Sequence, residues 1–205
     1  MTRRLGIIGA GGHGKVAAET ALRCGWEEVI FFDGLASSGA YDISHWSVVG
    51  EPASAVDVHC DGYFVAIGNA VHRRTWCEWL LSHDLPLVSL CDPSAVISQF
   101  ARIGEGVLVV AGAVVNVDAR IERGAIINTG ACVDHDCVIG EYSHVCPGAA
   151  LGGEVRVGES SWLGIGCQVK QCISIGRSVT VGAGATVVSD IGDGLTVVGT
   201  PARAV

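Results

Sequence analysis

The chain has 205 residues, of which 49% are apolar, so it is long enough to bury a hydrophobic core. Its formal net charge of −8 argues against a nucleic-acid or anionic-membrane partner, because binding to phosphate backbones needs clustered lysine and arginine. The 29 glycines follow no collagen-like period and therefore indicate tight turns. We expect a globular protein with small-molecule partners.

The cysteines and the apolar stretches bear on where the protein works. Nine cysteines are present, without a C-x-x-C pair, and the chain opens as MTRRLGIIGAGG with no secretory signal. We therefore expect reduced thiols and a cytoplasmic location. The longest apolar run is VLVVAGAVV, and it is shorter than the roughly 20 residues of a membrane-spanning helix. The sequence predicts no transmembrane segment.

The first part of the chain alternates apolar stretches with helical ones. Strands are predicted at 5–9, 28–33 and 63–67, helices at 15–24 and 71–83, and a further extended stretch at 87–90. We expect residues 37–49 to form a loop, and Trp76 and Trp79 to lie in the core. This is a βαβ opening that is too short for two mononucleotide-binding halves. It predicts an α/β half-Rossmann domain over residues 1–92.

A glycine-rich turn precedes the first expected helix. Gly9, Gly11 and Gly14 fit G-x-G-x-x-G, and Asp33 follows at the end of the next strand. This arrangement is typical of dinucleotide-binding folds and allows an NAD-dependent oxidoreductase. The missing second half argues against NAD, and the same turn at a helix N-terminus can hold the phosphates of a nucleotide sugar. Turn glycines with no ligand are the purely structural alternative.

From residue 97 onward, an aliphatic residue recurs every six positions. A six-residue period with glycine-rich corners matches neither a helix nor an ordinary strand, and it is typical of hexapeptide repeats. We expect a left-handed parallel β-helix domain over residues 93–205, with three hexapeptides to a coil and about five coils. No insertion interrupts the period, so any site must lie on the prism itself. The sixteen repeat positions are Ile97, Ile103, Val109, Val115, Ile121, Ile127, Val133, Ile139, Val145, Leu151, Val157, Leu163, Val169, Ile175, Val181 and Val187.

The stretch VDHDCVIGEYSH places two histidines and three carboxylates among the repeats. His135 and His144 are nine residues apart, half of an 18-residue coil, so they must lie on different faces of one prism. If both serve one reaction, the site must be built between subunits, and a cyclic trimer would give three equivalent sites. A zinc site between subunits, as in gamma-type carbonic anhydrases, would need three imidazoles, and the repeats hold two.

Three segments together resemble a known family. The turn GAGGHGK, the repeats carrying NTGACVDHDCVIGEYSHVCPGA and the closing GTPAR resemble bacterial sugar acetyltransferases of the bacillosamine, perosamine and sialic-acid pathways. The resemblance covers essentially the whole chain and is closest to UDP-4-amino-4,6-dideoxy-sugar N-acetyltransferases. It implies acetyl-CoA as the donor, no metal, a homotrimer, and a nucleotide-linked 4-amino-4,6-dideoxy sugar as the acceptor in glycan biosynthesis, with UDP favoured. A sialic-acid type O-acetyltransferase and a non-catalytic sugar-binding scaffold remain alternatives.

The resemblance also assigns roles to residues. His135 would be the general base, and Asp136 would raise its basicity. Family members on the bacillosamine route carry Glu at the latter position, so Asp134 competes as the partner. The resemblance places His144, Ile165 and Ala183 at acetyl-CoA, and it places Gly11, Gly12, His13, Asp33 and Gly34 at the nucleotide sugar.

Each histidine has a simpler interpretation. His135 could be a solvent-facing corner residue, His144 a surface or subunit-contact residue that points outward beside Val145, and His13 a cap of the helix that follows it. The amides of the Gly152-Gly153 corner are candidates for holding the oxyanion of an acyl-transfer reaction, but the sequence does not decide which one does.

Overall fold

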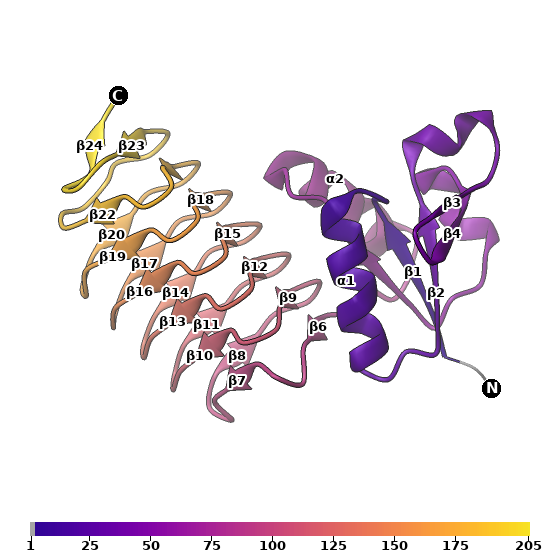
Figure 1. Cartoon of the computed structure of the whole chain (residues 1–205), viewed down its shortest axis with the longest axis horizontal. Helices are drawn as coiled ribbons and strands as arrows, with labels where there is room; N and C mark the ends of the chain where they lie inside the picture. The colour runs from indigo at the N-terminus through magenta and orange to yellow at the C-terminus, as the bar shows by residue number, and fades with distance from the viewer. Residues whose placement is uncertain (1–2) are drawn as a thin grey trace. The chain divides into compact units, whose positions relative to one another are not determined.

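The computed structural model describes residues 3–205; Met1 and Thr2, where the predicted first domain begins, lie outside the described residues. The chain divides into two compact units, Met1–Leu90 and Cys91–Val205. The first unit holds both helices, and the second is a regular stack of short strands that ends at the C-terminus (Figure 1). The division falls beside the Cys91-Asp-Pro93 stretch, where the character of the sequence changes.

The first unit is a five-stranded sheet in the order β3-β4-β2-β1-β5. Strand β1 pairs in parallel with β2 and β5, β2 pairs in parallel with β4, and β3 joins β4 antiparallel. This is the parallel core that the half-Rossmann prediction requires. Neither α-helix of the described chain is long and apolar enough to cross a membrane. The elements are β1 (Arg4–Ile8), α1 (Gly12–Arg23), β2 (Glu28–Phe32), η1 (Gly34–Ser38), β3 (Tyr41–Ile43), β4 (Trp46–Gly50), η2 (Pro52–Asp57), β5 (Gly62–Val65) and α2 (Ala70–Ser82).

Two parts of this unit differ from the sequence-based expectation. The expected loop over 37–49 contains the β3–β4 hairpin, which forms because Val48 is fully buried and the Trp46 ring packs edge-on against Phe31 at 6.1 Å. Helix α1 begins at Gly12, three residues before the predicted start, because the glycine turn itself supplies the first helical turn. Gly14 must be glycine there, since a Cβ would collide with the carbonyl oxygen of Gly9.

The second unit is a left-handed parallel β-helix with three faces. From β7 to β22 the strands pair in parallel at a spacing of 18 residues, as Val115 does with Val133, whereas β23 pairs with β21 at a spacing of 16 residues and β24 joins β23 antiparallel. The β7 face holds β7 (Val96–Ile97), β10 (Val114–Val115), β13 (Cys132–Val133), β16 (Ala150–Leu151), β19 (Gln168–Val169) and β22 (Thr186–Val187). The β8 face holds β8 (Arg102–Ile103), β11 (Arg120–Ile121), β14 (Val138–Ile139), β17 (Arg156–Val157) and β20 (Ser174–Ile175). The β9 face holds β6 (Leu90–Cys91), β9 (Leu108–Val109), β12 (Ile126–Ile127), β15 (His144–Val145), β18 (Trp162–Leu163), β21 (Thr180–Val181), β23 (Thr196–Val198) and β24 (Arg203–Ala204).

The predicted hexapeptide period is confirmed. Each of the sixteen repeat residues is the second residue of a strand from β7 to β22, and all of them belong to or pack against one continuous core. Glycine follows many of these residues because the next coil passes close by: a Cβ on Gly140 would lie 2.7 Å from the Glu159 nitrogen. Ser143 and Ser161 replace the usual small apolar residue in this core, and each hydroxyl donates to a backbone carbonyl at 2.8 Å.

Candidate active site

His135 and Asp136 lie at the corner that joins β13 to β14, between the β7 face and the β8 face. Asp136 adopts a left-handed backbone conformation with φ of 59°, as do Asp118, Glu154 and Cys172 at the same position of neighbouring coils. Such a residue turns the chain sharply, so the corner side chains project from the prism. The side chains of His135 and Asp136 are 49% and 55% exposed. The pair is therefore open to a substrate.

The geometry distinguishes the two candidate carboxylates. Asp136 Oδ2 lies 2.8 Å from His135 Nδ1, whereas Asp134 Oδ1 accepts hydrogen bonds from the His135 backbone nitrogen and from Asn116 Nδ2, each at 2.8 Å. Asp136 is thus the partner of the ring, and Asp134 holds the backbone of the corner. Because a carboxylate can only accept, the neutral imidazole carries its proton on Nδ1 and leaves Nε2 free to act as a base.

The electrostatic surroundings of His135 favour its protonated form. The hydrogen bond to Asp136 raises the pKa of His135 above its usual value, and the negative charges of Asp134, Asp136 and Glu154 act in the same direction. Within the described residues, no group of three or more His, Cys, Asp or Glu side chains is placed to hold a metal ion.

The imidazole of His135 lies directly over Gly153 of the next coil. A Cβ on Gly153 would be 2.5 Å from Cε1 of the ring, so any larger residue would push the imidazole aside. In the described chain, the Gly153 amide donates to no protein acceptor, whereas the Gly152 amide donates to the Val169 oxygen at 3.0 Å. Gly153 therefore leaves room for the ring and offers a free N–H beside it. The sequence indicated the Gly152-Gly153 corner as a candidate oxyanion site but could not decide which of the two amides is available.

His144 has a different environment, on the β9 face. Its side chain points away from the inward Val145, as expected, yet the residue is only 5% exposed. The amide Nδ2 of Asn128 lies 3.0 Å from His144 Nε2, and the Trp162 ring packs edge-on at 4.4 Å. The amide donates to Nε2, so the neutral ring carries its proton on Nδ1. Sequence reasoning missed Asn128, although it belongs to the NTGACVDHD segment that carries the resemblance.

Ile165 and Ala183 are exposed on stacked turns at a third position, the corner between the β9 face and the β7 face. They are 18 residues apart and therefore occupy the same place on successive coils. One prism does not bring this corner together with His135, which lies at the opposite edge of the β7 face. The structure thus places His135 beside Asp136, and Ile165 on the coil next to Ala183. The two pairs lie at different corners of one prism.

In the first unit, Asp33 joins the glycine turn to the strand that follows α1. Its Oδ2 accepts from the Ala10 nitrogen at 2.8 Å, and its Oδ1 accepts from the Leu35 nitrogen at 3.0 Å. A pocket of about 390 Å³ opens here, and Trp76, expected in the core, is one of its walls. Gly11, Gly12 and His13 lie at the start of α1 and do not line it. The lining residues are Ile8, Gly9, Asp33, Gly34, Glu51, Pro52, Ala53, Ile67 and Trp76.

His13 lies beside a buried cation. Arg73 is fully buried, and its Nη1 donates to the carbonyl oxygens of Ile67 and Gly68 at 2.7 and 2.6 Å. Burial, reinforced by the positive charge of Arg73, lowers the pKa of His13 to about 4. His13 is therefore neutral near pH 7 and can interact with a ligand only as a hydrogen-bonding ring.

Comparison with known proteins identifies the family to which the whole chain belongs. It is 39% identical to the acetyltransferase domain of PglB from Neisseria gonorrhoeae, solved in complex with acetyl coenzyme A, with a TM-score of 0.95 and complete coverage of both chains. The chain belongs to the hexapeptide-repeat family of bacterial sugar acetyltransferases. Another member is perosamine N-acetyltransferase from Caulobacter crescentus, of which a mutant was solved with CoA and GDP-perosamine, at 38% identity and a TM-score of 0.96 over 100% of this chain and 98% of that one.

Further comparisons agree with this membership. Residues 4–80 match the model of the PglD N-terminal domain. WeeI from Acinetobacter baumannii is 27% identical over both complete chains, with a TM-score of 0.90. A search of curated proteins found no match. The α/β unit followed by a left-handed β-helix is thus the fold of a sugar acetyltransferase family.

Proposed function

We propose that this protein transfers the acetyl group of acetyl-CoA to the 4-amino group of a nucleotide-linked 4-amino-4,6-dideoxy sugar. The observation that carries the proposal is the His135–Asp136 pair on an open corner of an acetyltransferase prism, with the imidazole lying over Gly153, whose amide donates to no protein acceptor in the described chain. Both groups that acyl transfer to an amine needs, a base and an oxyanion donor, are then within one corner.

The reaction follows from this geometry. The neutral sugar amine attacks the thioester carbon, a C–N bond forms, and His135 Nε2 takes a proton from the nitrogen. The Gly153 amide stabilises the negative charge that develops on the carbonyl oxygen. The C–S bond then breaks, and the CoA sulfur leaves with the proton that His135 held. Asp136 orients the ring and stabilises the imidazolium, without taking the proton itself.

The first unit would bind the nucleotide part of the acceptor. Asp33 and Gly34 line its 390 Å³ pocket, which suits a nucleoside, while Gly11, Gly12 and the neutral His13 lie at the N-terminus of α1, where phosphates are stabilised. The resemblance favours UDP as the nucleotide. The nine free cysteines accord with a reducing compartment, which supports a cytoplasmic location and a role in building bacterial glycan precursors.

We further propose that the active enzyme is a homotrimer with the three β7 faces directed at the symmetry axis. This face connects the His135 corner to the Ile165 and Ala183 corner, so facing three copies inward puts the two corners of neighbouring protomers side by side. Its outward residues are uncharged, whereas the β8 face carries three arginines. The outward residues of the β7 face are Val96, Val114, Cys132, Ala150, Gln168 and Thr186.

If the three β7 faces meet in a trimer, a charge introduced on this face should weaken the assembly. Ala150 is exposed in the single chain and would become buried against its symmetry mates, so Ala150→Arg should dissociate the trimer. Sedimentation velocity should show a smaller species, and acetyl transfer should fall with the fraction of trimer. Thr180→Arg, at an exposed strand position on the β9 face, is the matched control for assembly. A fully active monomer would contradict the proposal.

The pH dependence of the reaction should report the His135–Asp136 pair. The base must be neutral, so kcat/KM should rise with pH through a pKa above the ordinary histidine value, because Asp136 raises it. Asp136→Asn removes the main cause of that increase, so the inflection should move to lower pH and the alkaline plateau should fall by about tenfold or more. Asp134→Asn should shift the inflection less. An unchanged inflection in Asp136→Asn would mean that another group is the base.

The substrate class is tested by measuring CoA thiol release with UDP-, GDP- and dTDP-linked 4-amino-4,6-dideoxy sugars, alongside sugars that offer only hydroxyl acceptors. Release with an amino sugar supports N-acetylation, and release only with hydroxyl acceptors would favour the O-acetyltransferase alternative. Quenching of NADH fluorescence tests the oxidoreductase alternative. Folded protein that binds the sugar but not acetyl-CoA would instead be a scaffold.

A further inference from the structure

The catalytic imidazole spans two coils of the prism. On its own coil, Nδ1 of His135 lies 2.8 Å from the Asp136 carboxylate. On the next coil, a Cβ added to Gly153 would lie closest to Nε2 and Cε1 of the same ring. The basic nitrogen is therefore at the level of the next coil, beside the residue that follows Gly153. That residue is Glu154, whose backbone nitrogen donates to the His135 oxygen at 2.9 Å.

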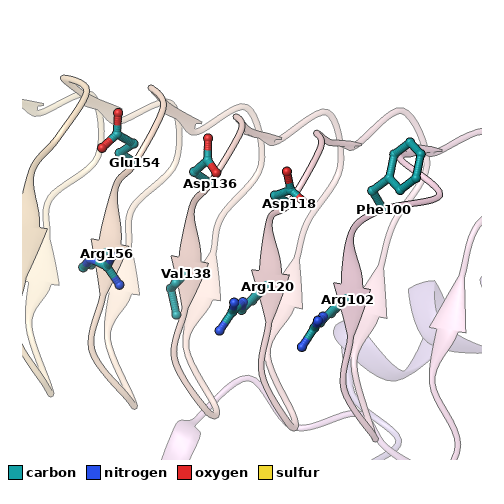
Figure 2. Close-up of a pocket in the computed structure, with 8 residues that line it drawn as sticks. All are labelled: Phe100, Arg102, Asp118, Arg120, Asp136, Val138, Glu154 and Arg156. Atoms are coloured by element: carbon teal, nitrogen blue, oxygen red, sulfur yellow. The ribbon is translucent and has the colours of Figure 1, made fainter.

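Glu154 has a carboxylate that is available to a ligand. Asp118, Asp136 and Glu154 occupy equivalent corners of successive coils, with φ of 57°, 59° and 62°, and they line a groove of about 610 Å³. Figure 2 shows their carboxylates projecting to one side, away from the guanidinium of Arg156 on the same coil as Glu154. Within residues 3–205, the Glu154 carboxylate forms no ion pair and accepts no hydrogen bond.

The two carboxylates that flank Asp136 are not equivalent with respect to the base. The His135 ring lies over Gly153, on the coil of Glu154, and the negative charge of Glu154 helps to raise the pKa of His135. Asp118 lies one coil on the other side of Asp136 and is not among the charges that raise this pKa. Glu154 is therefore the unpaired carboxylate nearer to Nε2, and Asp118 is its matched counterpart.

An amine and a hydroxyl bring different numbers of hydrogens to this corner. The acceptor amine carries two N–H bonds: one proton passes to His135 Nε2 during the reaction, and the other hydrogen stays on the amide product. The retained N–H can donate to a carboxylate, and this bond strengthens as positive charge develops on the attacking nitrogen. A hydroxyl has a single hydrogen, which the base takes. A second acceptor beside Nε2 therefore favours an amine.

We propose that Glu154 accepts a hydrogen bond from the retained N–H of the acceptor amine and so makes the enzyme select amines over hydroxyls. This inference rests on the proposed function, which supplies the amine, the base and the thioester. The C–N bond forms and the C–S bond breaks as in the proposed reaction. His135 Nε2 takes the proton that leaves the nitrogen, and Glu154 binds the N–H that stays, without taking a proton.

The test compares Glu154→Ala with Asp118→Ala, which removes a carboxylate from an equivalent exposed, left-handed corner. The ligands are the 4-amino-4,6-dideoxy nucleotide sugar and its 4-hydroxy analogue, which lacks the second hydrogen. Glu154→Ala should lower kcat/KM for the amino sugar about tenfold, the usual loss for a hydrogen bond to a charged group. Glu154→Gln keeps an oxygen acceptor and should lose less. The inhibition constant of the 4-hydroxy analogue, the KM for acetyl-CoA and the Asp118→Ala enzyme should be unchanged.

Other kinetic outcomes would overturn the proposal. An equal weakening of the 4-hydroxy analogue would mean that Glu154 does not distinguish the nitrogen. An equal loss in Asp118→Ala would assign the effect to the general negative charge of the groove, and a raised KM for acetyl-CoA would assign Glu154 to the donor. A wild-type rate in Glu154→Ala would refute the contact.

Calorimetric binding without acetyl-CoA keeps the test independent of the reaction. The wild type should bind the amino sugar more tightly than the 4-hydroxy analogue, and Glu154→Ala should lose most of that difference. The same preference in the wild type and in Glu154→Ala refutes the role of Glu154. Failure of the proposed function shows separately, as no thiol release by the wild type with any acceptor.

Discussion

His135→Ala should lower kcat/KM for acetyl transfer by about 10²- to 10⁴-fold, the usual contribution of a positioned general base. The structural reason is that His135 Nε2 is the free ring nitrogen of this corner, whereas Asp136 and Asp134 are bound to the ring and the backbone of the same corner. Steady-state thiol release with the preferred amino-sugar acceptor measures the effect.

The fold should survive this change. His135 is half exposed at a corner, and its backbone bonds, including the one from the Glu154 nitrogen to the His135 oxygen at 2.9 Å, do not need the imidazole. The melting temperature and the trimer should therefore match those of the wild type. His72→Ala, at an exposed position of α2, controls for loss of a histidine elsewhere. A variant that kept the full rate would remove His135 from the mechanism and leave the pair as a surface feature.

Much of the fold could be predicted because its signals are local and repeated. The six-residue period identifies which residue of every strand points inward, and the structure confirms all sixteen positions. The β3–β4 hairpin was missed because it is stabilised by a contact distant in sequence, between Trp46 and Phe31, rather than by a strong alternation of its own.

The site could be predicted only in part. The corner residues were recognisable, but the choice between Asp134 and Asp136 depends on side-chain direction, which sequence order does not encode. The packing of Asn128 on His144 and of His135 on Gly153 joins residues 16 and 18 positions apart, and it becomes visible only once the coils are stacked. The three arginines of the β8 face are spaced 18 and 36 residues apart in the sequence, and only the strand register shows that they lie on one face.

Gly153→Ala tests that stacking directly, and we expect a loss of about 10²-fold in kcat with little change in stability. The added methyl would occupy the position of the His135 ring, so the imidazole must rotate away from both the free Gly153 amide and the position of the amine. A misplacement of about 1 Å in a reacting group is enough to cost that much. The Gly153 backbone is not in the left-handed region, so alanine itself introduces no backbone strain there.

A control variant and a double variant show whether Gly153→Ala acts by displacing the His135 base or by a general structural defect. Gly192→Ala, in the same domain, should keep full activity, because its added Cβ would meet only Leu195 Cδ1, at an ordinary contact distance of 3.9 Å. Combining Gly153→Ala with His135→Ala should cost little more than His135→Ala alone, because the methyl acts chiefly through the ring it displaces. Additive losses would instead mean that Gly153 acts independently of His135, through the oxyanion or through acetyl-CoA itself. A wild-type rate in Gly153→Ala would show that the imidazole does not work from its place over this glycine.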